Sequence, residues 1–154
     1  MIEMYNYDYI KINEIFVYFL YQESFSKLCI DNLHDSIRFR CYSSLDVFRF
    51  SLELVRHSEF LIFRRNTLKF IRRCYTLKSK EINLLLAYIQ TEGDNLRSEV
   101  MKLQQNLRYC VIDEIDCFEL AMCIERYHTF KLHSRNILSL LGLYDKIIEL
   151  NLND

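Results

Sequence analysis

The feature that most constrains this chain is an internal repeat, shifted by 70 positions. The segment 45–71 recurs without a gap at 115–141. Residue pairs that are identical at this shift include Asp46/Asp116, Phe48/Phe118, Arg56/Arg126, Phe60/Phe130, Arg65/Arg135, Asn66/Asn136, Leu68/Leu138 and, upstream, Ile12/Ile82, Asn13/Asn83 and Tyr18/Tyr88. Apolar positions recur as well, for example at Leu45/Ile115, so a packing pattern is repeated. Such a repeat predicts two copies of one structural unit, which we place at residues 1–77 and 78–154.

Composition decides the class of that unit. The 154 residues include no proline and only two glycines, which excludes most sheets joined by tight turns. The hydrophobic fraction is 51%, a value typical of a folded globular chain. We therefore expect an all-α protein in which two units of five or six helices pack together.

Helical periodicity and capping residues predict where these helices begin and end. Helices are expected at about 10–21, 25–37 (capped by Ser24), from Ser43 to a corner at 57–60, 64–76, from Ser79 to Gly93, and from Asp94, Asp113 and Ser134 onward, with a last short helix after Gly142. The helix that starts near residue 64 is amphipathic and basic.

Charge is distributed unevenly between the two copies. The formal net charge is -1, but the segment 37–73 is rich in arginine, whereas the second copy is acidic. Oppositely charged faces on related units favour head-to-tail association into oligomers. Nucleic-acid binding by the basic segment is the weaker reading, because the whole chain is nearly neutral.

The sequence predicts a protein of the cytoplasm. Its N-terminus is acidic and rich in tyrosine, unlike a secretion signal, and no apolar run approaches the ~20 residues that span a bilayer. The six cysteines lie inside apolar helical patterns, so we expect reduced thiols. No membrane partner is expected.

No motif for catalysis, cofactor binding or metal binding stands out. Cys117, Cys123, His128 and His133 invite a zinc reading, but two cysteines five residues apart on one helix exceed the usual spacing. The acidic cluster that begins at Asp113 sits at a predicted helix start, where capping explains it. Glycine-rich phosphate loops and nucleophile elbows are missing from the sequence. We therefore expect a non-enzymatic protein without cofactors that acts through its surface.

The repeated stretch resembles the fourth and fifth helices of the death effector domain, a six-helix bundle of the death-fold superfamily. The residues that carry the resemblance are Leu45, Asp46, Phe48, Arg56, Phe60, Asn66 and Leu68 in the first copy, and Ile115, Asp116, Phe118, Arg126, Phe130, Asn136 and Leu138 in the second. Two such domains in tandem are similar to the viral FLICE-inhibitory proteins. The resemblance implies two tandem six-helix bundles and a virus-encoded decoy, in the cytoplasm of a host cell, that blocks apoptosis and modulates NF-κB signalling.

The resemblance also implies partners and partner-binding residues. The partners would be the host death-domain adaptor, the initiator procaspase or the regulatory subunit of the IκB kinase. The family's apolar docking pair on its second helix falls at Ile30 in the first unit, where Asp31 departs from the pattern, and at Val100 and Met101 in the second. The family's Arg-x-Asp-Leu motif is reduced to Arg73 in one unit and Asp145 in the other. The candidate partner-binding residues are Ile30, Val100, Met101, Arg64, Arg65, Arg72, Arg73 and Asp145.

Two other classes stay open. A poxvirus-type Bcl-2-like bundle would hold an amphipathic helix in a groove and inhibit apoptosis or NF-κB signalling, but it predicts one central buried helix and no internal symmetry. A basic helical nucleic-acid-binding protein would use Arg64, Arg65, Arg72 and Arg73, and its binding would weaken steeply with salt.

Overall fold

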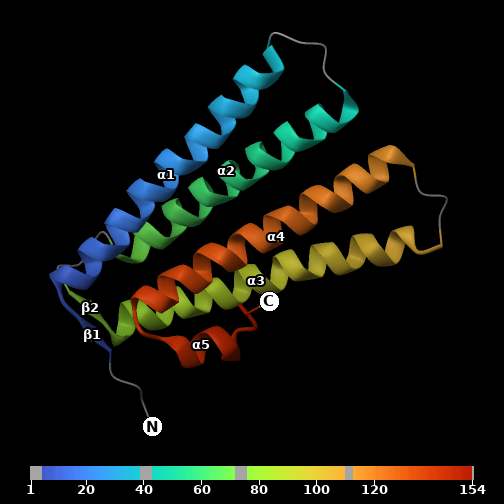
Figure 1. Ribbon diagram of the computed structural model, residues 1–154. Coiled ribbons are helices and arrows are strands. Elements are labelled where there is room, and N and C mark those ends of the chain that lie inside the picture. Colours follow the sequence, from blue (N-terminus) through green and yellow to red (C-terminus); the bar gives the residue numbers. More distant parts are fainter. Residues whose placement is uncertain (1–4, 39–42, 72–75, 110–112, 154) are drawn as a thin grey trace.

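The computed structural model describes residues 5–38, 43–71, 76–109 and 113–153. The described chain forms two long helical hairpins that pack side by side, with a short C-terminal helix on the second (Figure 1). The elements in chain order are β1 (Asn6–Tyr7), α1 (Tyr9–Arg38), α2 (Ser44–Ile71), β2 (Leu77–Lys78), α3 (Ser79–Leu107), α4 (Glu114–Leu140) and α5 (Tyr144–Glu149).

The predicted all-α class is confirmed, and the repeat is visible in three dimensions. Each half consists of a short strand and two long helices, and the corresponding elements are offset by about 70 residues. Two tandem six-helix bundles are not confirmed, because within the described residues each half has two long helices and only the second half adds α5. The predicted division between residues 77 and 78 falls inside β2.

The predicted helix breaks inside the hairpin arms are wrong. Ser24 lies within α1, the predicted corner at 57–60 lies within α2, Gly93 lies within α3, and Ser134 lies within α4. A polar residue or one glycine costs a helix interior about 1 kcal/mol at most, and packing along a hairpin arm offsets that. With no proline present, nothing in these segments forces the helices to end.

Gly93 lies inside α3, close to Phe130 of α4. A Cβ at this position would lie 3.5 Å from a ring carbon of Phe130, which is an ordinary van der Waals distance, so the packing there does not require a glycine. The second glycine matches its prediction. Gly142 has a φ of 71°, which favours glycine, and it makes the corner between α4 and α5.

The two predicted caps at the starts of α2 and α4 are confirmed, and they explain one repeated residue. The Asp46 backbone N–H donates to the Ser43 hydroxyl over 3.3 Å, while the Asp46 carboxylate accepts from the Ser43 backbone N–H over 3.0 Å. In the second half, the Asp116 N–H donates to Asp113 over 2.8 Å. Asp46 and Asp116 are therefore the third residues of matching capping boxes.

A two-stranded antiparallel ribbon, which the sequence did not predict, ties the hairpins together at their base. Tyr7 of β1 pairs with Leu77 of β2, and these residues occupy equivalent positions in the two copies. The Ser79 hydroxyl accepts from the Tyr5 backbone N–H over 2.7 Å beside this ribbon. An antiparallel pair of equivalent residues lies where a two-fold axis relating the halves would pass.

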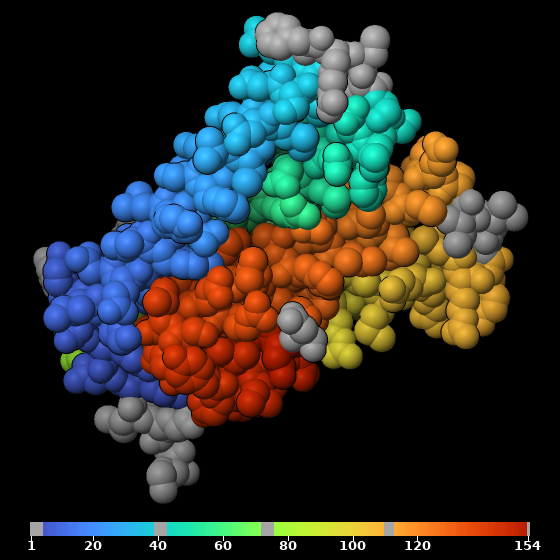
Figure 2. Space-filling model, in the orientation of Figure 1, coloured from blue at the N-terminus to red at the C-terminus, as the bar shows by residue number. Residues whose placement is uncertain are grey.

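The centre of the molecule is the contact between α2 and α4. The ring of Phe63 lies 5.8 Å from that of Phe130, and the ring of Phe60 lies 5.0 Å from that of His133. Because Phe60 is equivalent to Phe130 and Phe63 to His133, these two contacts are equivalent under the repeat. One hydrophobic cluster contains buried residues of both halves. Figure 2 shows the C-terminal part of α4 lying directly against α1 of the first hairpin.

Repeated polar residues join one hairpin to the other. The Asn66 amide donates to the Tyr88 hydroxyl over 3.3 Å, and the equivalent Asn136 amide donates to the Tyr18 hydroxyl over 3.1 Å. At the far end of the interface, the ring of Phe48 packs edge-on against that of its equivalent, Phe118, at 6.0 Å. Several residues that are identical at a shift of 70 therefore lie in the interface between the two hairpins, where they contact each other in equivalent ways.

Candidate functional site

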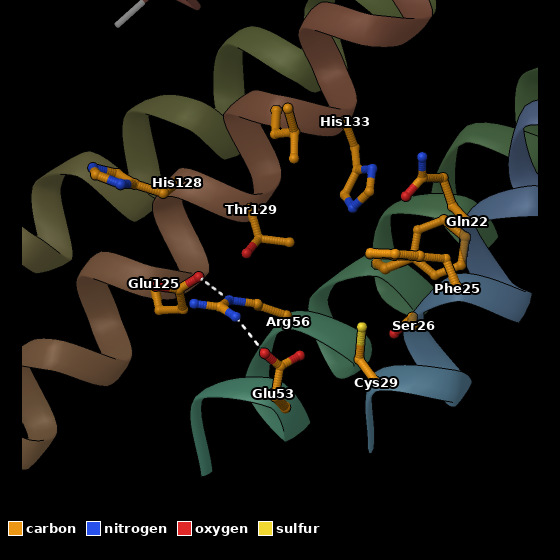
Figure 3. Close-up of a pocket in the computed structure, with 12 residues that line it drawn as sticks. Gln22, Phe25, Ser26, Cys29, Glu53, Arg56, Glu125, His128, Thr129 and His133 are labelled. Carbon is orange, nitrogen blue, oxygen red and sulfur yellow. Dashed lines mark hydrogen bonds and ion pairs between the residues drawn. The ribbon is translucent and has the colours of Figure 1, made fainter. Parts of the chain in front are cut away.

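The first candidate site is a pocket of about 210 Å³ between α1, α2 and α4 (Figure 3). Its polar lining includes Arg56 of α2, Glu125 of α4 and the buried imidazole of His133. The Arg56 guanidinium donates over 2.5 Å to Glu53 of its own helix and over 2.5 Å to Glu125 across the interface. Both acidic partners raise the pKa of Arg56, which therefore stays charged and paired.

The imidazole of His133 is neutral at pH 7. Burial lowers its pKa to about 4, and its Nδ1 lies 2.7 Å from the Tyr18 hydroxyl. A neutral ring can accept at Nδ1, so Tyr18 donates to His133 while it accepts from Asn136. The histidine thus belongs to a satisfied polar cluster that joins α1 to α4.

A second histidine, His57, joins the two helices of the first hairpin. Its Nδ1 lies 2.7 Å from the hydroxyl of Ser26, which also lines the pocket. Burial is the main cause that lowers the pKa of His57, so this ring too favours its neutral form. The hydrogen bond links α1 to α2, so both side chains have a structural role.

Metal binding is not supported in the part of the chain that the structure describes. No group of three or more histidine, cysteine or acidic side chains there is arranged to hold a metal ion. Cys117 is an exposed free thiol near the start of α4, Cys123 is a half-buried free thiol, and His133 is bound to Tyr18.

The ion pair that crosses this pocket is expected to add little stability. Arg56 is 44% exposed, and pairs that water reaches contribute about 0.2–1 kcal/mol. We predict a coupling energy in that range from a double-mutant cycle of Arg56→Ala and Glu125→Ala, measured by urea unfolding. A coupling above about 2 kcal/mol would show that the pair is shielded from solvent and holds the hairpins together.

The second candidate site is an apolar cleft between the N-terminal ends of α2 and α4, where the two hairpin tips diverge (Figure 1). It is open to solvent and has a volume of about 790 Å³. Equivalent residues of the two copies face each other across it, and the lining residues are Ser44, Leu45, Val47, Phe48, Asp113, Glu114, Ile115, Cys117 and Phe118. We call this set the tip cleft.

The apolar side chains of the tip cleft face water. Leu45 is 60% exposed, Val47 is 52% exposed and Ile115 is 73% exposed. Contiguous exposed apolar side chains with a polar rim are typical of protein interaction sites. The charged groups in the lining are the carboxylates of Asp113 and Glu114. The cleft can therefore bury the apolar face of a partner segment.

The structure does not gather the predicted partner-binding residues into one surface. Ile30 on α1 and Val100 on α3 are half-buried equivalents, Met101 is exposed, and Asp145 lies in the first turn of α5. Arg64 and Arg65 line a common groove between α1 and α2 of the first hairpin. Arg72 and Arg73 lie outside the described residues.

The tip cleft was missed because its residues also belong to the repeated packing pattern. Leu45 and Ile115 were expected to be packing positions of the repeat, yet both side chains are exposed. One signal was available. Both residues lie in the first turn of a helix, next to acidic capping residues, and first turns at hairpin tips are rarely covered by neighbouring helices.

Two observations concern the chain as a whole. No described helix is both long enough and apolar enough to cross a membrane. Comparison with protein-family models, with curated proteins and with solved structures finds no match for the chain. The inferences about function that follow therefore depend on its own residues.

Proposed function

We propose that this chain is a non-enzymatic protein-binding module that holds a helix of a partner protein in the tip cleft. The observation that carries the proposal is the exposed apolar lining at Leu45, Val47 and Ile115. Apolar grooves between helices commonly bind amphipathic helices. Covering these side chains would remove them from water, worth about 25 cal/mol for each Å² of apolar surface.

The rigid base of the molecule supports this role. The ribbon, the aromatic contacts of Phe63 and Phe130, and the two Asn–Tyr hydrogen bonds fix the hairpins at one end. At the tips, the contact between the rings of Phe48 and Phe118 joins the hairpins as well. A cleft between helices that are already packed together is organised for a ligand before binding, which lowers the entropic cost of binding.

Within this function, the sequence resemblance nominates death-receptor signalling proteins as partners. The module would act as a decoy in the cytoplasm of a host cell, bind the death-domain adaptor or the initiator procaspase, and inhibit apoptosis. Binding to the IκB kinase regulatory subunit would instead modulate NF-κB signalling. In this chain the decoy would use two long hairpins, so its binding face would differ from the helix-2 pair of the family.

A Bcl-2-like mode of binding is the alternative. It shares the amphipathic-helix ligand but requires a central buried helix in an unsymmetrical bundle. The matched contacts of Phe60 with His133 and of Phe63 with Phe130 count against that arrangement. The Bcl-2-like mode differs from the death-receptor decoy in its ligand, because only the Bcl-2-like mode predicts binding of a death-promoting amphipathic peptide.

Binding measurements with purified partners test the proposal. The immobilised chain would be presented with the death-domain adaptor, the initiator procaspase prodomain, the IκB kinase regulatory subunit and a death-promoting helical peptide. We expect one of them to bind, and Val47→Asp and Ile115→Asp each to weaken that binding at least about tenfold, since each places a charge in an apolar contact.

The matched control is Leu84→Asp, which alters an exposed leucine on α3 outside the cleft. This variant should bind as tightly as the unaltered chain. Partner binding that survives both cleft substitutions but is lost in Val100→Asp with Met101→Asp would transfer the binding face to α3. Absence of binding by all four partners would refute the death-receptor form of the proposal.

A further inference from the structure

The outer face of α1 carries large apolar residues that no other part of the described chain covers. Ile10, Val17, Tyr21 and Leu28 follow one another at steps of seven, four and seven residues, which places them in one line along the helix. Tyr9 and Leu20 lie beside this line. All six residues are between 56% and 66% exposed. We call these six residues the α1 stripe.

The α1 stripe lies on the side of the helix opposite to the core. Ile12, Ile15 and Phe19 of the same helix are buried, so α1 is apolar on both of its sides. A helix that is apolar all round is usually buried all round. In this chain α1 instead lies at the edge of the array of long helices, and its residues form part of the molecular surface (Figures 1 and 2). One apolar side of α1 therefore faces water.

The internal repeat shows that the fold does not require this apolar face. The helix equivalent to α1 is α3, and its outer side faces water in the same way. None of the six equivalent residues of α3 is a large apolar residue, and they are Ser79, Lys80, Ala87, Gln90, Thr91 and Ser98. The α1 stripe is therefore specific to the first hairpin, and such a surface is typical of a protein interface.

The area of this surface suits an interface between two proteins. An open groove of about 610 Å³ runs beside the stripe, lined by Tyr9, Ile10, Val17 and Tyr21 of α1 and by Leu140 of α4. The six residues of the stripe expose on the order of 700 Å², since a large side chain presents roughly 150–250 Å². Stable interfaces bury about 800 Å² on each partner. The stripe and the groove beside it are thus large enough for one.

The spacing of the stripe indicates which partner fits it. Steps of seven, four and seven residues read the same in both directions, so the line matches a second copy of itself turned end to end. In two antiparallel α1 helices related by a two-fold axis, Ile10 lies opposite Leu28 of the other copy, and Val17 lies opposite Tyr21. The carboxylate of Glu14, which lies within this line, then faces Ser24 rather than another carboxylate. A two-fold interface requires this kind of self-complementarity.

We propose that the α1 stripe is the interface of a two-fold dimer of this chain, in which the α1 helices of two copies pack antiparallel. This dimer is independent of the proposed binding function, since no residue of the stripe lines the tip cleft. It is also a closed assembly. Head-to-tail association through oppositely charged faces would instead continue to grow.

Analytical ultracentrifugation of the full chain tests the proposal. We expect a monomer–dimer equilibrium with a dissociation constant of about 10 µM or tighter. The dimer should persist from about 50 to 500 mM NaCl, because salt screens charges and the contacts of the stripe are apolar. Val17→Asp should weaken the dimer at least about tenfold, since it places a charge opposite Tyr21 in an apolar contact.

A charge swap tests the antiparallel arrangement. Ile10 and Leu28 lie about 27 Å apart along one helix, so they cannot contact each other within one chain. Ile10→Asp and Leu28→Arg should each weaken the dimer about tenfold. The double variant places each introduced carboxylate opposite the introduced guanidinium of the other copy. It should therefore dimerise about tenfold more tightly than either single variant at low salt.

The matched control is Ala87→Asp. It places the same charge at the exposed position of α3 that is equivalent to Val17. This variant should dimerise as the unaltered chain does. Thermal unfolding followed by circular dichroism would verify that all the variants fold.

Four results would overturn the proposal. The first is a chain that remains monomeric at about 1 mM, where even a weak interface would associate. The second is a dimer that Val17→Asp and Ile10→Asp leave unchanged, which would place the interface on another surface. The third is a double variant that dimerises no more tightly than the single variants, which would exclude antiparallel pairing. The fourth is growth into larger oligomers that high salt dissociates, which would assign the association to charged faces. The tip cleft is tested by other variants, so none of these results bears on it.

Discussion

Replacing Phe63 by alanine is expected to lower the free energy of unfolding by about 3–5 kcal/mol, the range for a phenylalanine removed from a packed core. The Phe63 side chain is completely buried. Its ring packs against those of Phe19 from α1, Tyr88 from α3, and Phe130 and His133 from α4. All four long helices therefore meet at this ring, and the cavity left by its removal cannot close without moving several of them. Urea denaturation followed by circular dichroism would measure the loss.

The same substitution at an exposed position provides the control. Phe25 on α1 is 54% exposed, and Phe25→Ala should change the free energy of unfolding by less than about 1 kcal/mol. Equal losses for the two variants would mean that the contact between α2 and α4 is not the centre of the fold. A large loss for Phe63→Ala together with a lower urea dependence would instead indicate that the hairpins separate before they unfold.

The features that the sequence predicted are those encoded by residue type and period. The absence of proline predicted the helical class, and the repeat predicted two equivalent halves, as observed in the described residues. Ser43 and Asp113 were predicted as caps and act as caps, since a short polar side chain before an apolar period satisfies free backbone N–H groups wherever the helix packs. Gly142 was predicted as a corner because few other residues adopt its backbone conformation.

The features that the sequence did not predict depend on tertiary packing. Ser24 and Gly93 resemble helix ends, yet each lies in a long arm whose packing outweighs a weak local preference. The ribbon pairs single residues such as Tyr7 and Leu77, too few to leave a periodic pattern. For the candidate sites, periodicity identifies apolar faces but not which of them a neighbouring helix covers. Leu45 at the tip cleft and Ile62 on α2 were therefore not recognised as exposed.

The second prediction is that the stability of the fold depends on pH through two buried titratable groups, Glu59 and His133, at the contact between α2 and α4. Burial is the main cause that raises the pKa of Glu59 to about 7; Arg126 opposes this shift, and the nearby carboxylates of Glu92 and Glu99 add to it. Arg126 lies 3.9 Å from the Glu59 carboxylate. Burial lowers the pKa of His133 to about 4.

These shifts make stability depend on pH in opposite directions. Between pH 4.5 and about 7, folded Glu59 holds a proton that unfolded Glu59 releases, so raising the pH through this window destabilises the fold. Between pH 6.5 and about 4, unfolded His133 takes up a proton that the folded state excludes, so lowering the pH destabilises the fold. Each effect amounts to about 3 kcal/mol at most. In the unaltered chain they oppose each other between pH 4.5 and 6.5.

Single substitutions should separate the two effects. In Glu59→Gln only His133 remains, so the free energy of unfolding should fall by up to about 3 kcal/mol as the pH is lowered from 6.5 to 4. In His133→Phe, which installs the residue found at the equivalent position 63, only Glu59 remains, so stability should fall as the pH is raised from 4.5 to 7. Urea denaturation at half-unit pH steps would measure both profiles, with His128→Phe as the control for replacing an exposed imidazole.

Parallel profiles for Glu59→Gln and the unaltered chain would show that Glu59 stays ionised in the fold, held by Arg126. A steep profile in the unaltered chain between pH 4.5 and 6.5 would show that one group dominates, and the direction of its slope would identify which.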